Sequence, residues 1–205
     1  MPTTITIRDV RFSYVTLFQP KPSMNDPKGE PKYSLTMLIP KTNIAALALI
    51  QQAISEAENA AVSAKWGNVK PPVVPAPLHD GDGVRQDGTP FGTECKGCWV
   101  MTASANVDHA PFVVDQNVQP IIDPKKVYSG CWGNVSVSFF GYNAAGKKGI
   151  GCGLNGVQFI RDGEPLGSRI TAEDAFGPAT YSAPIGSTYS TGAVDPITGQ
   201  PIYRS

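Results

Sequence analysis

The amino-acid sequence predicts a mainly β protein, built as a small barrel or sandwich with one α-helix, long loops and a flexible C-terminal tail. Glycine (21) and proline (19) together make up 40 of the 205 residues, about a fifth, against a usual share of about 12%. A chain with so many turn-forming residues cannot be mostly helical. Several segments alternate apolar and polar residues, as strands do, and only one has helical spacing. Strands come first, then a single helix, then strands joined by hairpins, and this order of elements excludes a regular βαβ fold.

Five or six strands are expected from these patterns. They are residues 3–15, 32–39, 98–105, 127–140 and 149–160, with a short strand or turn in 111–122. The first segment, TTITIRDVRFSYV, is rich in β-branched and aromatic residues, and a kink is expected near Asp9. The last two strands flank the segment GYNAAGKKG, which is typical of a turn, so they are expected to form a hairpin.

The one helix is expected between the second and third strands. Helical spacing begins after Thr42 or Asn43, both good N-cap residues, and continues to about Ala64. One face of this helix is expected to pack on the sheet: Ile44, Leu47, Ala48, Gln51, Ile54, Ala57 and Ala61.

Two segments are expected to lie outside the regular structure. Residues 65–95 are rich in Pro, Gly and Asp, and a loop of this length inside a domain is usually functional or mobile. Gly, Pro, Ser and Thr dominate residues 177–205, which therefore bury too little apolar surface to become ordered. The sequence thus predicts one domain, residues 1–176, followed by a flexible tail.

Charge and hydropathy exclude some classes of protein. The chain carries 17 Lys+Arg and 17 Asp+Glu, so it is not a polybasic binder, although local basic clusters remain possible on a folded surface. Its apolar stretches are far shorter than the roughly 20 residues of a membrane-spanning helix. The first residues lack the pattern of a secretory signal. We therefore expect a soluble cytoplasmic protein with no membrane partner.

Two glycine-rich motifs resemble nucleotide-binding loops. Gly151 to Gly156 matches G-x-G-x-x-G, but the residues that follow favour a strand and not the required helix. Gly141 to Lys148 resembles a phosphate-binding loop, with lysine where Ser or Thr should hold magnesium. We interpret the first as glycines in a twisted strand and the second as a hairpin turn. No bound cofactor is expected.

Cys95 and Cys98 have the spacing of half a zinc site. The other half would have to come from residues that form no second close pair: His79, His109, Cys131 and Cys152. The alternative is that all four cysteines are reduced and structural.

Neither a calcium site nor an active site has a clear signature. Asp80, Asp82 and Asp87 resemble a calcium loop, but Val84 and Arg85 stand where an acid and a glycine are needed, so turns are favoured. The chain has no G-x-S-x-G or H-E-x-x-H motif. We expect a protein that is not an enzyme, the alternative being a metal-dependent enzyme built on these acids or on the cysteines.

The segment 127–140 is the most informative. Its alternation places one face in the core: Val127, Cys131, Val135, Val137 and Phe139. The other face mixes rings with small polar residues: Tyr128, Trp132, Asn134, Ser136, Ser138 and Phe140. Exposed rings can stack on unpaired bases, each contributing roughly 1–3 kcal/mol without reading sequence. The alternative is that these rings cover a second layer of core.

Basic residues beside aromatic ones complete a candidate DNA-binding set, since cations can follow the phosphates while rings stack on bases. This set is Arg8, Arg11, Tyr14, Lys32, Tyr33, Lys65, Trp66, Tyr128, Trp132, Phe140, Lys147 and Lys148.

Five segments of the chain resemble a family of bacteriophage single-stranded DNA-binding proteins. They are Tyr33–Lys41, Lys65–Gly67, Pro77–Asp82, Tyr128–Phe139 and Lys148–Leu166, in one order over residues 30–176. The last of these, KGIGCGLNGVQFIRDGEPL, is the most specific.

The resemblance implies a five-stranded OB-type barrel, with 42–64 as its helix and 127–140 and 149–160 among its strands. It implies binding of single-stranded DNA, with little sequence preference, in phage replication or recombination. The tail would then regulate access to DNA or recruit phage replication or recombination proteins. Whether the protein is a monomer or a dimer stays open. The alternative function is that of a structural or assembly protein of a phage particle.

Overall fold

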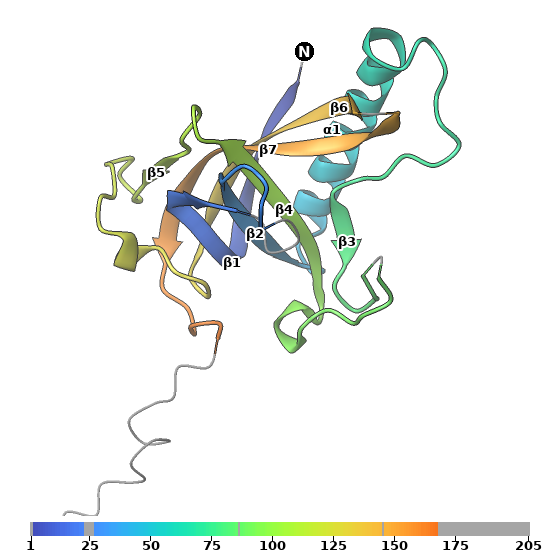
Figure 1. Ribbon diagram of the computed structural model, residues 1–205. Helices are drawn as coiled ribbons and strands as arrows, with labels where there is room; N and C mark the ends of the chain where they lie inside the picture. The colour runs from blue at the N-terminus through green and yellow to red at the C-terminus, as the bar shows by residue number, and fades with distance from the viewer. Residues whose placement is uncertain (1, 23–26, 86, 145, 168–205) are drawn as a thin grey trace, which may run out of the picture. The chain divides into compact units, whose positions relative to one another are not determined.

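The computed structural model describes residues 2–22, 27–85, 87–144 and 146–167. The predicted domain boundary at residue 176 and the tail 177–205 lie outside these residues. Figure 1 shows the elements in chain order: β1 (Thr3–Lys21), β2 (Lys32–Pro40), α1 (Ile44–Ala64), β3 (Leu78–Asp80), β4 (Cys98–Asn106), β5 (Phe112–Val114), β6 (Trp132–Ala144) and β7 (Lys147–Arg161). No helix within the described residues is long and apolar enough to cross a membrane.

Five of the strands close into a barrel. The sheet order is β3-β4-β2-β1-β6-β7-β5, and a further pairing joins β4 to β7. This closing pair is parallel, with Ser104 opposite Gly153, whereas the other barrel pairs are antiparallel. The predicted five-stranded OB-type barrel with one helix is therefore confirmed.

Strand β1 is bent because it pairs with two different partners. Its first half lies beside β6 and its second half beside β2. The pairing register shifts between Ile7 and Val10 and again after Ser13, as it does at β-bulges. Asp9 (φ 53°) and Tyr14 (φ 46°) take left-handed backbone conformations at these two places. The predicted kink near Asp9 is confirmed, and the strand continues six residues beyond its predicted end at residue 15.

The barrel interior is filled by the apolar residues that alternate along its strands. Fully buried side chains include Ile7, Phe12, Leu35, Met37, Met101, Val135, Val137 and Phe139. Val127 and Cys131 are also buried, so the predicted core face of 127–140 is confirmed. The predicted start of that strand at residue 127 is wrong. Ser129 and Gly130 form a turn, in which Gly130 has a φ of 121° and the strand begins only at Trp132.

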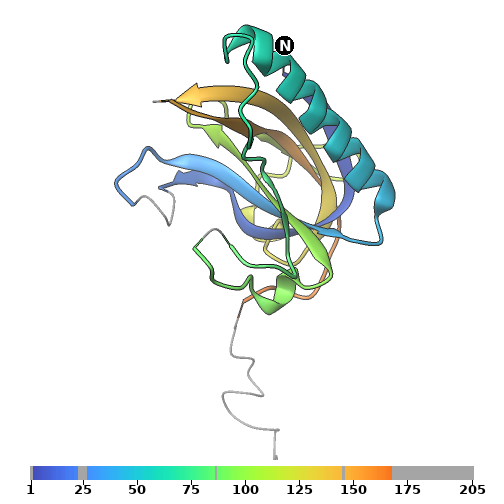
Figure 2. The same cartoon turned by 90° about the vertical axis from the view of Figure 1, so that its right-hand side faces the viewer.

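Helix α1 lies along the outside of the barrel, beside β1 and β6 (Figure 2). Its predicted bounds are confirmed. The Asn43 side chain caps its first turn by accepting a hydrogen bond from the Ala46 backbone N–H at 3.1 Å. The Asn43 Nδ2 also donates to the Arg8 carbonyl at 3.1 Å, which ties the start of the helix to β1.

The buried face of α1 differs in part from the predicted one. The buried residues are Ala46, Ile50, Ala53, Ala57 and Ala61, while Ile44 is 73% exposed. Small side chains face the barrel because the helix approaches β6 closely. At Gly141 an added Cβ would overlap the Cβ of Ala61. Packing distance, and not residue size alone, therefore decides which face is buried.

The glycines of β7 lie beneath aromatic rings on the outside of the barrel. Three such pairs occur: Gly149 with Tyr142, Gly151 with Phe140 and Gly156 with Phe112. In each pair an added Cβ would press into the ring, so glycine lets the ring lie against the strand. The motif from Gly151 to Gly156 lies wholly within β7, which confirms the strand interpretation over a nucleotide-binding loop.

The two sides of the β6–β7 hairpin offer a matched test of the helix contact. Gly141→Ala should destabilise the protein by about 1–3 kcal/mol, because the new methyl group must displace α1. Gly153→Ala adds the same group where its nearest neighbours are 3.5 Å away, and its effect should stay within about 1 kcal/mol. Urea unfolding of both variants measures the difference. Equal stabilities would show that the helix is not held against β6 at Gly141.

Candidate nucleic-acid interface

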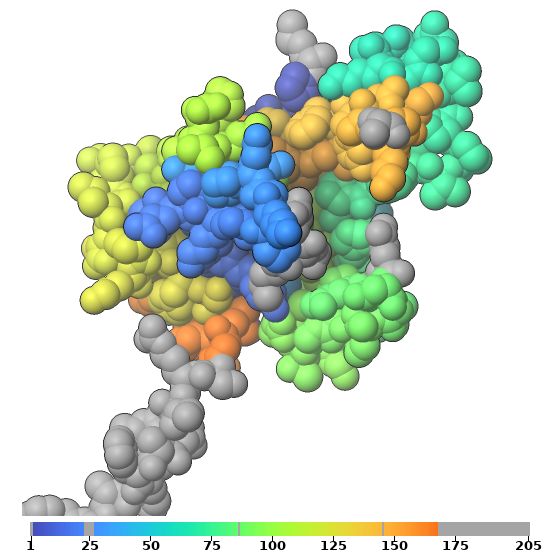
Figure 3. Space-filling model, viewed as in Figure 1, coloured from blue at the N-terminus to red at the C-terminus, as the bar shows by residue number. Residues whose placement is uncertain are grey.

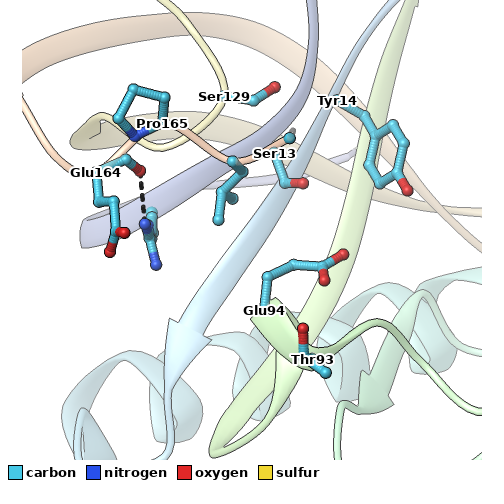
Figure 4. Close-up of a pocket in the computed structure, with 10 residues that line it drawn as sticks. Ser13, Tyr14, Thr93, Glu94, Ser129, Glu164 and Pro165 are labelled. Atoms are coloured by element: carbon cyan, nitrogen blue, oxygen red, sulfur yellow. Dashed lines mark hydrogen bonds between the residues drawn. The ribbon is translucent and has the colours of Figure 1, made fainter. Parts of the chain in front are cut away.

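Two adjoining pockets form one groove across β1, β2 and β4. The first, of about 570 Å³, lies between β1, the loop before β4 and the segment after β7, and is drawn in Figure 4. The second, of about 850 Å³, extends toward the β1–β2 loop and is lined by Lys21, Lys32, Ser34 and Thr102, among others. Tyr14 and Ser129 line both pockets. We call this continuous surface the β1–β2–β4 groove.

The floor of the groove is polar and shallow because small hydroxyl side chains point outward there. Ser34 lies opposite Ser104 and Thr36 opposite Thr102 in the β2–β4 pair. The Thr36 and Thr102 hydroxyls are hydrogen-bonded at 2.9 Å. Such a floor can donate and accept hydrogen bonds without filling the groove.

Loops rise around this surface on one side of the barrel. In Figure 2 the β1–β2 loop, the β6–β7 hairpin tip and the loop before β4 all project to the left. Figure 3 looks onto that side, where these segments stand around a hollow. An extended chain lying across the strands would therefore be flanked by loops.

Tyr14 stands where the two pockets meet. Its side chain is 55% exposed. Its backbone is left-handed at the β1 bulge, where the pairing register shifts and the side chain points outward. A non-glycine residue in this conformation costs roughly 1–3 kcal/mol, so the surrounding pairing must hold it. An exposed ring in the middle of a polar groove is suited to base stacking.

Two lysines face each other at one end of the groove. Lys21 and Lys32 are directly opposite in the β1–β2 pair, and both are exposed. Like charges in this relation repel each other, and an anion bound between them would relieve the repulsion. Sequence reasoning singled out Lys32 but missed Lys21, because the expected first strand ended at residue 15.

Arg11 lies in the first pocket but serves partly as a structural clamp. Its Nη2 donates to the Glu164 carbonyl at 2.6 Å and its Nε to the Gly130 carbonyl at 3.3 Å. These bonds tie β1 to the segment after β7 and to the turn before β6, and they use two of the five N–H groups of Arg11. Arg8, also in the candidate set, is exposed and does not line the groove.

Trp66 does not belong to a binding surface. It is only 2% exposed, and its Nε1 donates to the Tyr142 carbonyl at 2.9 Å, so its ring packs in the core between α1 and the hairpin. The prediction that it stacks on DNA is therefore corrected. Lys65 is exposed beside it, and Lys148 donates to the Trp66 carbonyl at 3.1 Å. Lys147 is exposed at the hairpin tip.

The remaining rings of the candidate set lie away from the groove lining. The Tyr128 hydroxyl donates to Asp162 Oδ1 at 2.9 Å, and Tyr33 is half-buried in the strand row that faces the barrel interior. Trp132 is half-buried, with the Arg161 guanidinium 4.3 Å from its ring centroid. Phe140 is 38% exposed over Gly151. Stacking by these rings stays a prediction.

Lys41 makes several of the contacts that fasten the loop before β4. Lys41 Nζ lies 2.5 Å from Asp80 Oδ1 and 2.6 Å from Asp82 Oδ2, and 5.2 Å from the centroid of the Trp99 ring. Asp82 Oδ1 also accepts from the Gly97 N–H at 3.0 Å. These contacts hold the loop that brings Thr93 and Glu94 to the groove.

The loop acids and cysteines therefore have structural surroundings. Asp87 accepts from the Thr89 N–H at 2.9 Å, as in an Asx turn. Burial raises the pKa of the Cys95 and Cys98 thiols. Within the part of the chain that the structure describes, no three His, Cys, Asp or Glu residues are grouped so as to hold a metal ion.

A closed five-stranded barrel, crossed by a polar groove with an exposed ring and paired lysines, defines an OB-type nucleic-acid-binding protein. The chain belongs to the family described as "Enterobacter phage Enc34, ssDNA-binding protein", whose profile matches residues 3–184. The family resemblance inferred from the sequence is confirmed, and it favours DNA binding over a structural role in a phage particle.

Individual relatives also match most of this chain in sequence or in fold. Protein p50 of Acyrthosiphon pisum secondary endosymbiont phage 1 is 31% identical over 170 residues, 78% of this chain and 84% of that one. The bacteriophage Enc34 single-stranded DNA-binding protein in complex with ssDNA is 28% identical, with a TM-score of 0.66 over 80% of this chain and 90% of that one. Gp2.5, a single-stranded DNA-binding protein of bacteriophage T7, shares only the fold, with 15% identity and a TM-score of 0.52 over 91% and 100% of the chains.

The Lys41 contacts predict how the loop before β4 responds to pH. Hydrogen bonds from Lys41 lower the pKa of Asp80 and Asp82, and those carboxylates raise the pKa of Lys41. The carboxylate contribution is therefore present above the ordinary Asp value of 3.8 and is lost as the pH falls through the lowered values. The lysine contribution is present below 10.5 and is lost as the pH rises past the raised value.

Lys41→Ala should accordingly lower the hydrogen-exchange protection factors of residues 81–97 at pH 7, and these factors, taken relative to the intrinsic exchange rate at each pH, should no longer change with pH. Lys70→Ala, which breaks the Lys70–Glu58 ion pair on another surface, is the matched control and should leave this loop unchanged. Equal protection of the loop in both variants would show that Lys41 does not fasten it.

Proposed function

We propose that this protein binds single-stranded DNA in the β1–β2–β4 groove, with little sequence preference, during phage replication or recombination. The family supports this function, and so does the relative of known structure that holds ssDNA. The observation that carries the location is the position of Tyr14, exposed between the two pockets and followed by the opposed lysines Lys21 and Lys32.

The groove offers each part of a single strand a matching group. Phosphates carry charge that Lys21 and Lys32 can neutralise, and an unpaired base can lie on the Tyr14 ring. In a duplex the bases are already stacked and paired, so the ring would have no free base to contact. The binding is therefore proposed to be selective for single strands and to involve no chemical reaction.

Two further proposals concern the setting of this activity. A protein that coats phage DNA as it is copied would act in the cytoplasm of the host bacterium. Residues 177–205, rich in Gly, Pro, Ser and Thr, are proposed to contact phage replication or recombination proteins. That proposal rests on composition alone, since these residues lie outside the described part of the chain.

Salt dependence tests the phosphate contacts. Each neutralised phosphate should release about 0.7 counterion on single strands, so the logarithm of oligo-dT affinity should fall linearly with the logarithm of salt concentration. Lys21→Ala/Lys32→Ala should give a shallower slope. Lys125→Ala/Lys126→Ala removes the same charge from a different pocket and should keep the wild-type slope. Equal slopes for the two double variants would place the phosphate path elsewhere.

The stacking role of Tyr14 is tested by truncating its ring. Tyr14→Ala should weaken oligo-dT binding by roughly 1–3 kcal/mol, whereas Tyr14→Phe, which keeps the ring, should bind nearly as well as wild type. Fluorescence titration at fixed salt measures both.

Trp132→Ala tests stacking by Trp132, the ring that the sequence predicts to contact a base. Arg161 stacks on that ring and pairs with Asp9 at 2.9 Å, so a base would have to displace the guanidinium. Wild-type affinity in Tyr14→Ala together with a large loss in Trp132→Ala would move the site to the outer face of β6.

A further inference from the structure

The first pocket of the groove is lined by two glutamates, the exposed Glu164 and the more buried Glu94, and phosphate binding does not explain a buried carboxylate there. Glu94 belongs to the short turn Thr93–Cys95 before β4 and is half-buried. In Figure 4 its carboxylate reaches into the pocket on the side where Tyr14 lies. A negative charge here repels the backbone of any nucleic acid, so it must either weaken binding or meet a part of the nucleotide that carries no charge.

The carboxylate lies against the backbone of its own loop. Its oxygens lie against Gly92, where an added Cβ would collide with them. The loop that carries both residues is fastened to β2 through Lys41 and Asp82. An acceptor on a fastened loop can select hydrogen-bond donors, because a base in the pocket meets it from a limited range of directions.

The pocket holds a donor as well as this acceptor. Arg11 lines it, with three guanidinium N–H groups beyond the two bonded to Gly130 and Glu164. The hydroxyls of Ser13 and Ser129 line it too. With the Tyr14 ring as one wall, the pocket offers a stacking surface, a cationic donor and an anionic acceptor, in a space of about 570 Å³.

Guanine is the base whose edges match this combination. Its O6 and N7 atoms are acceptors for arginine, the commonest specific contact to a base in DNA. Its N1–H and N2 amino groups are two adjacent donors, which a carboxylate can accept together. Cytosine and adenine offer one amino group beside an unprotonated ring nitrogen, and thymine offers one N–H between two carbonyl oxygens, so each presents a repelling acceptor to Glu94.

We propose that the pocket between Tyr14 and Glu94 takes a guanine from the bound single strand, with Glu94 accepting from its Watson–Crick edge. This inference rests on the proposed function and adds a preference at one position to binding that is otherwise indifferent to sequence. Tyr14 stacks on any base, and Glu94 determines which base binds most tightly in this pocket.

The experiment compares oligo-dT strands that differ at one central base. The full-length protein is titrated with oligo-dT, with the same strand carrying one dG, and with one carrying deoxyinosine, which lacks the N2 amino group. The dG strand should bind about 5-fold more tightly than oligo-dT, the lower end of the range for a bidentate base contact. The deoxyinosine strand should lose most of that gain in affinity. This comparison alters only the DNA, so no change in protein folding can explain the result.

Matched variants identify the residue responsible. Glu94→Gln keeps the shape but replaces one acceptor oxygen with a donor, and should abolish the dG preference while oligo-dT affinity stays equal or rises. Glu164→Gln makes the same charge change on an exposed side chain of the same pocket and should keep the preference. Thermal unfolding verifies that both variants fold.

The other outcomes are distinct. Equal affinity of wild type for all three strands would overturn the guanine pocket but leave single-strand binding intact. So would a Glu94→Gln variant that binds all three strands more tightly by the same factor, since Glu94 would then only repel phosphates. Failure to bind any strand would overturn the proposed function together with this inference.

Discussion

The whole fold depends on one strand serving two partners. β1 can close the barrel only by turning from β6 to β2 along its length, and the left-handed conformations at Asp9 and Tyr14 mark the two places where the pairing shifts. A left-handed non-glycine residue is costly, and here the ladders on either side of each bend compensate for it. The second bend also sets Tyr14 outward. The same local distortion therefore closes the barrel and exposes the ring on which the groove is centred.

A chain with no net charge can still bind a polyanion if its charges are sorted in space. In this protein the sorting is local. Lys41 is paired with the carboxylates of Asp80 and Asp82, so its charge offsets part of the negative charge at the start of the groove-side loop and is not available to DNA. Lys21 and Lys32 lie opposite each other in the β1–β2 pair, and within the described part of the chain neither forms an ion pair. The average charge of the sequence therefore says little about the potential in the groove, because pairing decides which charges remain available.

Much of the architecture follows from local patterns in the sequence. The strand and helix periods, the N-cap at Asn43 and the kink at Asp9 depend on residues that are near neighbours in the chain, so they could be predicted. The buried face of α1 could not, since it depends on how closely Gly141 lets the helix approach. Trp66 illustrates the same difficulty: an aromatic residue beside a lysine looks like a binding residue until the hairpin supplies its hydrogen-bond partner.

The site was harder to predict than the fold, because its groups meet only through strand pairing. Lys21 lies opposite Lys32 across a hairpin whose loop separates them in sequence. Glu94 reaches the groove from a loop whose motifs, the Cys95/Cys98 pair and the aspartates around it, resemble metal sites and do not indicate DNA binding. The alternation of aromatic residues in 127–140 is visible in the sequence and therefore predicts a binding face there. Tyr14 owes its exposure to a bulge, which the sequence does not reveal. A bulge shifts every later side chain relative to the simple alternation.

The glycines under the rings of β6 and β5 have a consequence for how this surface can evolve. A Cβ on Gly151 would meet the Phe140 ring, and one on Gly156 would meet the Phe112 ring, so growth at either glycine displaces its ring. A larger residue at the glycine becomes acceptable only after its aromatic partner has become smaller. Substitutions at these positions should therefore show strong sign epistasis, and related sequences should vary there in compensating pairs or not at all.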